Sequence, residues 1–239
     1  MRIIVKLLNQ KGRLSFARTL AWGWRGQMAS AFILLMTCMA DLPLWAGGIR
    51  DVWQTVPDTI VPAIDRVRRL EMLDLVDYKV KAEVKNMLGS NSVMDTLTAD
   101  YLHITISASS EMAISLLPCG DGDSVICVLR TYMGPEPDSE ITFYTPCWQP
   151  LDAAAYLPFH SLSESWQQLV VRPDTISPER YGELMTLVRV PLVGAVMSCD
   201  GRHIDLSLSV PMQGIDDRPA MAAIASCRRM TWNGQRFVW

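Results

Sequence analysis

The stretch YLHITISASSEMAISLL, residues 101–117, decides the fold, because its apolar side chains recur at every second position. Leu102, Ile104 and Ile106 alternate with Tyr, His and Thr, and the same alternation resumes at Met112 after a polar break. A period of two is typical of strands with one buried face. The stretch therefore predicts two β-strands joined by a short connection.

Two further strands are predicted downstream. SVICVLRTY at 124–132 follows the turn residues GDGD at 120–123, and SEITFYTPCW at 139–148 follows a second turn, GPEPD at 134–138. Gly, Pro and Asp are the residues that turns favour. Four strands with short connections predict an antiparallel meander.

Two helices are predicted before these strands. DTIVPAIDRVRRL at 58–70 places Ile60, Ile64 and Val67 at helical spacing. DLVDYKVKAEVKNMLG at 74–89 is predicted as a second helix. Its apolar face would hold Val76, Val80, Val84, Met87 and Leu88, with Asp74 as N-cap and Gly89 as C-terminal stop. The expected fold class is α+β, with the helix pair packed on one face of the four-stranded meander within residues 47–152.

A second, smaller α+β half is predicted at 177–239, after a connection at 153–176 that holds at most one short element. Its expected elements are a helix at 177–188 capped by Ser177, a hairpin over 193–210 with a turn at Asp200-Gly201, a short helix at 216–226, and a last hairpin with a type I′ turn at Asn233-Gly234.

The first 46 residues have the pattern of an export signal. A basic, acid-free lead precedes the apolar run AFILLMTCMA at 31–40, and small residues at Ala46-Gly47 follow. The apolar run is shorter than the ~20 residues that span a bilayer. We therefore predict a signal peptide at 1–46 and a location in the periplasm or cell envelope. The alternatives are an uncleaved membrane-anchoring start, an initiator at Met28, and a lipid anchor at Cys38.

Charge is unevenly distributed along the chain. The whole chain carries 22 Lys+Arg and 25 Asp+Glu, a net charge of −3. Residues 1–46 hold six basic side chains and one acid, a balance of +5, so the remainder carries −8. An acidic body without a clustered basic face argues against a nucleic-acid partner.

Five cysteines follow the predicted signal, an odd number for a compartment in which disulfides form. A hairpin centred near Pro137 would set Cys127 opposite Cys147, which makes this pair a candidate disulfide. The alternative is a pair of buried thiols.

Tyr132, Tyr144 and Trp148 alternate onto the strand face opposite Cys127. If the helices cover the Cys127 face, these three rings lie outward and form a candidate binding surface. The alternative is that the rings pack beneath the second half of the chain.

No sequence motif of a hydrolase, nucleotide-binding loop, metal site or cofactor site is present. The three histidines, His103, His160 and His203, lie at positions expected to be on the surface. Cys199, Asp200 and His203 flank a tight turn, and the turn explains them without a metal. We predict no catalytic residue, no metal ligand and no cofactor.

Several segments of the chain resemble a known family. They are WQTVPDTIVP at 53–62, LDLVDYKVKAEVKNMLG at 73–89, LTADYLHITIS at 97–107, VICVLRTYMGPEPDSEITFYTPCWQPL at 125–151 and TWNGQRFV at 231–238. Through them the chain resembles an uncharacterised family of small secreted proteins, a domain of unknown function from Gram-negative gut anaerobes. The resemblance implies export and residence in the cell envelope, and it supplies no reaction or ligand. The order of helices and strands is also similar to that of β-lactamase-inhibitor-like modules, an analogy of fold alone.

The sequence thus favours an exported, non-enzymatic envelope protein that binds another macromolecule through a sheet face, its partner an envelope protein or polymer. The competing hypothesis is an exported hydrolase with a site between the two halves, using Asp58, Asp100 or His160.

Overall fold

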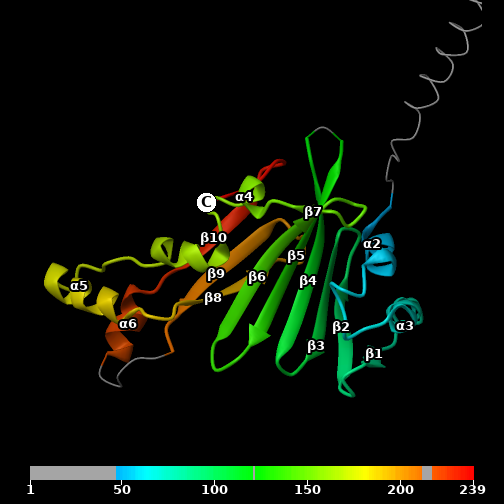
Figure 1. Cartoon of the computed structure of the whole chain (residues 1–239), viewed down its shortest axis with the longest axis horizontal. Coiled ribbons are helices and arrows are strands. Elements are labelled where there is room, and N and C mark those ends of the chain that lie inside the picture. The colour runs from blue at the N-terminus through cyan, green and yellow to red at the C-terminus, as the bar shows by residue number, and fades with distance from the viewer. Residues whose placement is uncertain (1–46, 121, 212–216) are drawn as a thin grey trace, which may run out of the picture. The chain divides into compact units, whose positions relative to one another are not determined.

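The predicted meander is present and continues beyond four strands. The computed structural model describes residues 47–120, 122–211 and 217–239, and residues 47–239 form one compact unit. Its two sheets are antiparallel, one of seven strands in sequence order and one of four strands in the order β11-β10-β9-β8 (Figure 1). The predicted signal at 1–46 lies outside the described residues.

The seven-stranded sheet contains all four strands predicted for the first half. Each pairs antiparallel with the next along the chain, as the short turns required. Three strands, β1, β2 and β7, were not predicted. The strands are β1 (Ala82–Lys85), β2 (Asn91–Leu97), β3 (Tyr101–Ser107), β4 (Ser110–Pro118), β5 (Ser124–Met133), β6 (Pro137–Tyr144) and β7 (Pro150–Leu151).

The helix predicted at 74–89 is wrong. Helix α3 (Arg66–Asp77) ends just inside that segment, and Lys79 then adopts a left-handed φ of 57°, which stops the helix. The chain continues as β1, in which Ala82 and Val84 are buried by pairing with β2. Gly89, with φ 83°, lies in the turn between β1 and β2 and ends no helix.

The other predicted helix begins later than expected. Ile60 and Ile64 lie in turns, and α3 starts only at Arg66, after the side chain of Asp65 accepts a hydrogen bond from the Arg68 amide. Pro62 lies between Ile60 and Ile64, and because proline lacks a backbone N–H a helix cannot continue through it. A helix not predicted, α2 (Ile49–Thr55), precedes this region and buries Trp53.

The second half matches its prediction more closely. Helix α5 (Pro178–Leu187) begins with Ser177 accepting from the Arg180 amide and with proline in its first turn. In the last hairpin Asn233 pairs with Arg236, so the turn is centred one residue later than expected, on Gly234-Gln235. The 153–176 connection holds two short helices rather than one. The remaining elements are α4 (Ala153–Tyr156), the 3-10 helix η1 (Leu162–Gln168), β8 (Leu192–Met197), β9 (His203–Ser209), α6 (Arg218–Ile224), β10 (Cys227–Trp232) and β11 (Phe237–Val238).

The two sheets share the main hydrophobic core. Cys127, Leu129 and Phe143 from β5 and β6 pack into it with Leu206 and Trp232 of the smaller sheet. The face of the larger sheet that contains Cys127 is therefore covered by the second sheet and not by helices. The opposite face is joined to the segment between α2 and α3, where the Arg130 guanidinium donates to the carbonyl of Ile60.

The outer edge of β8 is closed by side chains of the larger sheet. The amide of Val193 donates to the Asp138 carboxylate at 3.3 Å, and the amide of Ala195 donates to the Ser139 hydroxyl at 2.9 Å. The hydroxyl of Thr131 donates to the Ala195 carbonyl at 3.4 Å. Backbone groups at a strand edge that lack a neighbouring strand need such partners.

Candidate functional site

A histidine between two carboxylates is the main cluster of titratable groups in the larger sheet. Nδ1 of His103 lies 3.2 Å from Oδ2 of Asp95, and Nε2 lies 3.7 Å from Oε2 of Glu111. The three residues come from β2, β3 and β4, which are neighbours in the sheet. An imidazole held between two acids can exchange protons with both, which is the arrangement that acid–base chemistry uses.

A β-bulge brings Asp95 to this position. The pairing of β2 with β3 shifts register between Met94 and Thr96, so Asp95 has no direct partner on β3. Its carboxylate instead accepts from the amide and the hydroxyl of Thr105, at 3.0 and 2.7 Å. Bulges re-aim side chains in this way and are frequent beside functional sites.

A small cavity lies beside this cluster. A cavity of ≈ 30 Å³ lies between Tyr101, His103 and Glu111 of the larger sheet and Ala195 and Met197 of β8. That is about the volume of one water molecule. Burial, with smaller effects from Cys199, Glu111 and Asp95, raises the pKa of Tyr101 to about 12. The phenol therefore remains neutral at ordinary pH.

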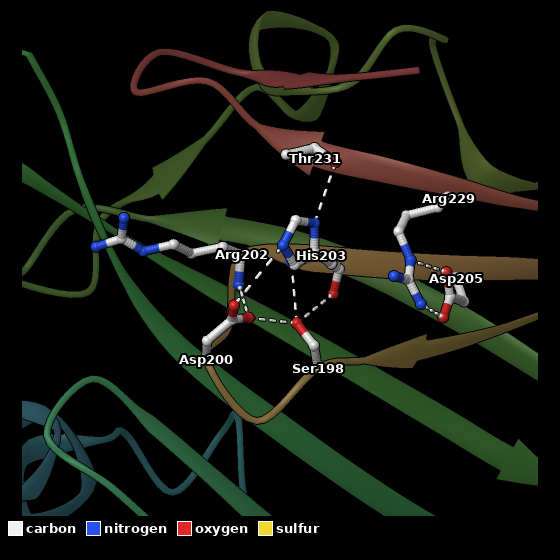
Figure 2. A network of polar contacts seen from close by, with 7 residues as sticks. All are labelled: Ser198, Asp200, Arg202, His203, Asp205, Arg229 and Thr231. Carbon is white, nitrogen blue, oxygen red and sulfur yellow. Dashed lines mark hydrogen bonds and ion pairs between the residues drawn. The ribbon is translucent and has the colours of Figure 1, made fainter.

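The turn between β8 and β9 carries a second polar network (Figure 2). The Ser198 hydroxyl donates to Asp200 at 2.5 Å and accepts from the His203 amide at 3.0 Å, while Nδ1 of His203 lies 3.1 Å from the Thr231 hydroxyl. The hydrogen bond from Ser198 is the main cause that lowers the pKa of Asp200. Because Ser198 bonds to the acid and not to the imidazole, these residues stabilise a turn and do not form a nucleophilic triad.

The predicted aromatic surface is divided between two ends of the β5–β6 pair. Tyr132, 46% exposed, pairs with Asp138 beside the hairpin turn. Tyr144 lies at the other end, its ring 5.5 Å from that of Trp148. The Trp148 indole N–H donates to the Thr55 hydroxyl at the end of α2, at 3.2 Å. Tyr144 and Trp148 thus meet each other and α2, while Tyr132 stands apart.

The expected register of the two cysteines is corrected by the strand pairing. Cys127 lies opposite Phe143, and Cys147 lies in the turn after β6, exposed. Both cysteines are free, and burial raises the pKa of the Cys127 thiol. Cys147 is an even number of residues after Phe143, as the expected pairing required. However, β6 ends at Tyr144, so Cys147 lies beyond the paired residues.

The residues suggested for a hydrolase are in separate surroundings. Asp58 accepts from the buried guanidinium of Arg69 at 2.9 Å, and the backbone of Asp100 pairs with Leu116. His160 is exposed after α4. Among the described residues no hydrogen bond or ion pair joins these three, and no group of three or more His, Cys, Asp or Glu side chains could hold a metal ion.

A ligand-sized cavity lies elsewhere, and no sequence signal had marked it. It has a volume of ≈ 390 Å³, within the ~300–1,000 Å³ typical of ligand sites. Its lining comes from the β5–β6 turn (Pro135, Glu136), the end of β9 and the next residues (Leu208, Ser209, Val210, Pro211) and α6 with its flank (Arg218, Met221, Ala222, Ala225).

The model of a family described as "Protein of unknown function (DUF3256)" matches residues 42–237. The chain belongs to the DUF3256 family. A solved structure described as a domain of an uncharacterized protein from Porphyromonas gingivalis W83 is similar in fold, with a TM-score of 0.65 and 20% sequence identity. The similarity covers 80% of this chain and 96% of that one. No protein with a curated description matches the chain.

The DUF3256 match includes both sheets, because residues 42–237 run from before α2 into β11. The resemblance seen in the sequence was strong only to about residue 155, so the family match extends it through the second half. Neither comparison names a ligand or a reaction. No helix in the described ranges has the length and apolar character needed to cross a membrane.

Proposed function

We propose that this DUF3256 chain is a non-catalytic binding protein of the cell envelope that holds a segment of another protein at the tip of the β5–β6 hairpin. The cavity of ≈ 390 Å³ beside that tip carries the proposal. Two exposed apolar side chains, Tyr132 and Met133, immediately precede the turn that lines the cavity. Exposed apolar side chains next to a concave site are typical of protein-binding surfaces.

The sizes of the two cavities favour binding over catalysis. The titratable cluster around His103 borders ≈ 30 Å³, and the large cavity is lined by apolar side chains with Glu136 and Arg218 as its charged residues. An active site needs acid–base groups and substrate space at the same place. Here the two features are apart, which supports a site that binds and does not react.

The polar lining suits a peptide segment. Glu136 and Arg218 are both exposed and form no ion pair with a described residue, so either can pair with a charged group of a ligand. Leu208 and Met221 form an apolar part of the cavity lining, against which a side chain of the bound peptide can pack. The export predicted from residues 1–46 would place such a partner in the envelope.

The experiment compares two leucine substitutions on α6. Ala222→Leu fills the cavity, whereas Ala223→Leu, also exposed, changes a residue outside its lining. We expect Ala222→Leu and Tyr132→Ala to reduce capture of an envelope protein by tenfold or so, and Ala223→Leu to leave capture unchanged. Capture from envelope extracts is quantified by mass spectrometry. Equal capture by all three variants would refute the proposal.

A further inference from the structure

Exposed apolar side chains gather around α3 and β1. Half of the large apolar residues that the described ranges leave exposed lie between positions 67 and 88, six of twelve. Met87 and Leu88, at the β1–β2 turn, are 66% and 77% exposed. Concentrated exposure of this kind marks an interaction surface. The six residues, here termed the α3–β1 surface, are Val67, Leu70, Tyr78, Val80, Met87 and Leu88.

The β1–β2 turn holds its two apolar residues outward on a fixed frame. Buried Asn86 donates to the Ile106 carbonyl at 3.0 Å and accepts from the Leu88 amide at 3.0 Å. The Met87 amide donates to the Ala63 carbonyl at 2.9 Å, which ties the turn to the chain just before α3. These hydrogen bonds hold the turn in a fixed conformation.

Basic residues surround this surface. Arg69 is buried and pairs with Asp58; without it, residues 66–88 hold five basic and four acidic side chains, a balance of +1, within a chain region from 47 to 239 that carries −8. Arg66, Lys79 and Lys85 are exposed and have no ion pair with any described residue. Lys79 lies between exposed Tyr78 and Val80, and Lys85 lies two residues before Met87.

We propose that the α3–β1 surface docks on an anionic lipid membrane. Exposed apolar side chains can enter the boundary between headgroups and acyl chains, and unpaired cations beside them are attracted to anionic headgroups. Exposed apolar side chains interleaved with unpaired cations match the boundary between headgroups and acyl chains of an anionic membrane. The charge contrast between this surface and the rest of the chain orients the molecule with β1 and α3 toward the lipid.

The test is binding of the full chain to vesicles of phosphatidylcholine with and without phosphatidylglycerol. The double variant Met87→Asp/Leu88→Asp removes the apolar tip, and Val171→Asp/Val190→Asp makes the same change at two exposed valines of the second half. We expect the first variant to bind phosphatidylglycerol vesicles about tenfold or more weakly, and the second to bind like the wild type. Lys85→Glu is expected to weaken binding by about tenfold.

Hydrogen exchange on the vesicles localises the contact independently of residues 1–46, which all variants share. Protection of the segments around Tyr78–Val80 and Met87–Leu88 on addition of phosphatidylglycerol vesicles is the expected result. Equal vesicle binding by the two double variants would overturn the proposal. So would a wild-type chain that binds no vesicles while the Met87→Asp/Leu88→Asp chain loses capture of an envelope protein, because that result assigns the surface to a protein partner.

Discussion

Gly201 lies in close contact with the larger sheet. It lies in the β8–β9 turn with φ 69°, and a Cβ placed on it would stand 2.0 Å from the Ser115 hydroxyl oxygen and 2.7 Å from the Ser115 Cβ. Ser115 is fully buried in β4, so it cannot move aside freely. Gly201→Ala therefore tests how tightly the turn is seated on the sheet.

Two costs contribute to the expected loss. A left-handed backbone costs a non-glycine residue about 1–2 kcal/mol, and inserting a methyl group into a packed site costs about 1–3 kcal/mol. Gly201→Ala should thus lower the free energy of unfolding by roughly 2–5 kcal/mol. Gly234→Ala is the matched control, because Gly234 has φ 94° and open space around its Cβ position. It should lose only the backbone part, about 1–2 kcal/mol.

Urea unfolding of both variants measures the difference. Adding Ser115→Ala to Gly201→Ala should restore part of the loss, because the hydroxyl oxygen is the nearest clashing atom and makes no hydrogen bond in the described structure. If Gly201→Ala and Gly234→Ala lose the same free energy, the turn shifts away from Ser115 without cost, and the reasoning from close contact fails.

Three further predictions concern buried groups. Burial raises the pKa of Tyr101 to about 12, so the unfolded chain loses the phenol proton at a lower pH than the folded chain does. The free energy of unfolding should therefore be unaffected by Tyr101 below pH ~10 and should fall by roughly 2–3 kcal/mol between pH ~10 and ~12. Urea unfolding of Tyr101→Phe should lack this fall. Asp58→Ala should cost about 2–4 kcal/mol although Asp58 is 72% exposed, because Arg69, 3% exposed, then keeps a buried charge; Asp77→Ala, in an exposed pair, should cost under about 1 kcal/mol. Thiol labelling should spare Cys127 until the chain unfolds, and early labelling would contradict its burial.

The elements predicted well are those with clear boundary signals. Helix α5 has Ser177 and proline at its start, and the strands from β3 to β6 run for seven or more residues between turn residues. The hairpin of β8 and β9 is centred on a glycine whose positive φ only that residue adopts readily. Local chemistry determines these elements, so the sequence alone predicts them.

The segment after α3 was misread because two periods overlap in it. Valines at 76, 80 and 84 fit a helix, but the alternation around β1 covers only four residues, too short to outweigh them. What decides the outcome is pairing with β2 and the left-handed turn at Lys79, neither of which leaves a local signal. The candidate sites were missed for the same reason, because the bulge at Asp95 and the cavity beside α6 depend on segments far apart in the chain.

The closure of β8 by Thr131, Asp138 and Ser139 links the folding of the two sheets. Until the β5–β6 hairpin is present, the amides of Val193 and Ala195 have no partner, and an unprotected strand edge pairs readily with other chains. During synthesis from the N-terminus, the larger sheet is complete before β8 emerges. The side chains that pair with the β8 backbone are thus in place before β8 is synthesised. A fragment that begins after residue 152 lacks them and should aggregate under conditions in which the whole chain folds.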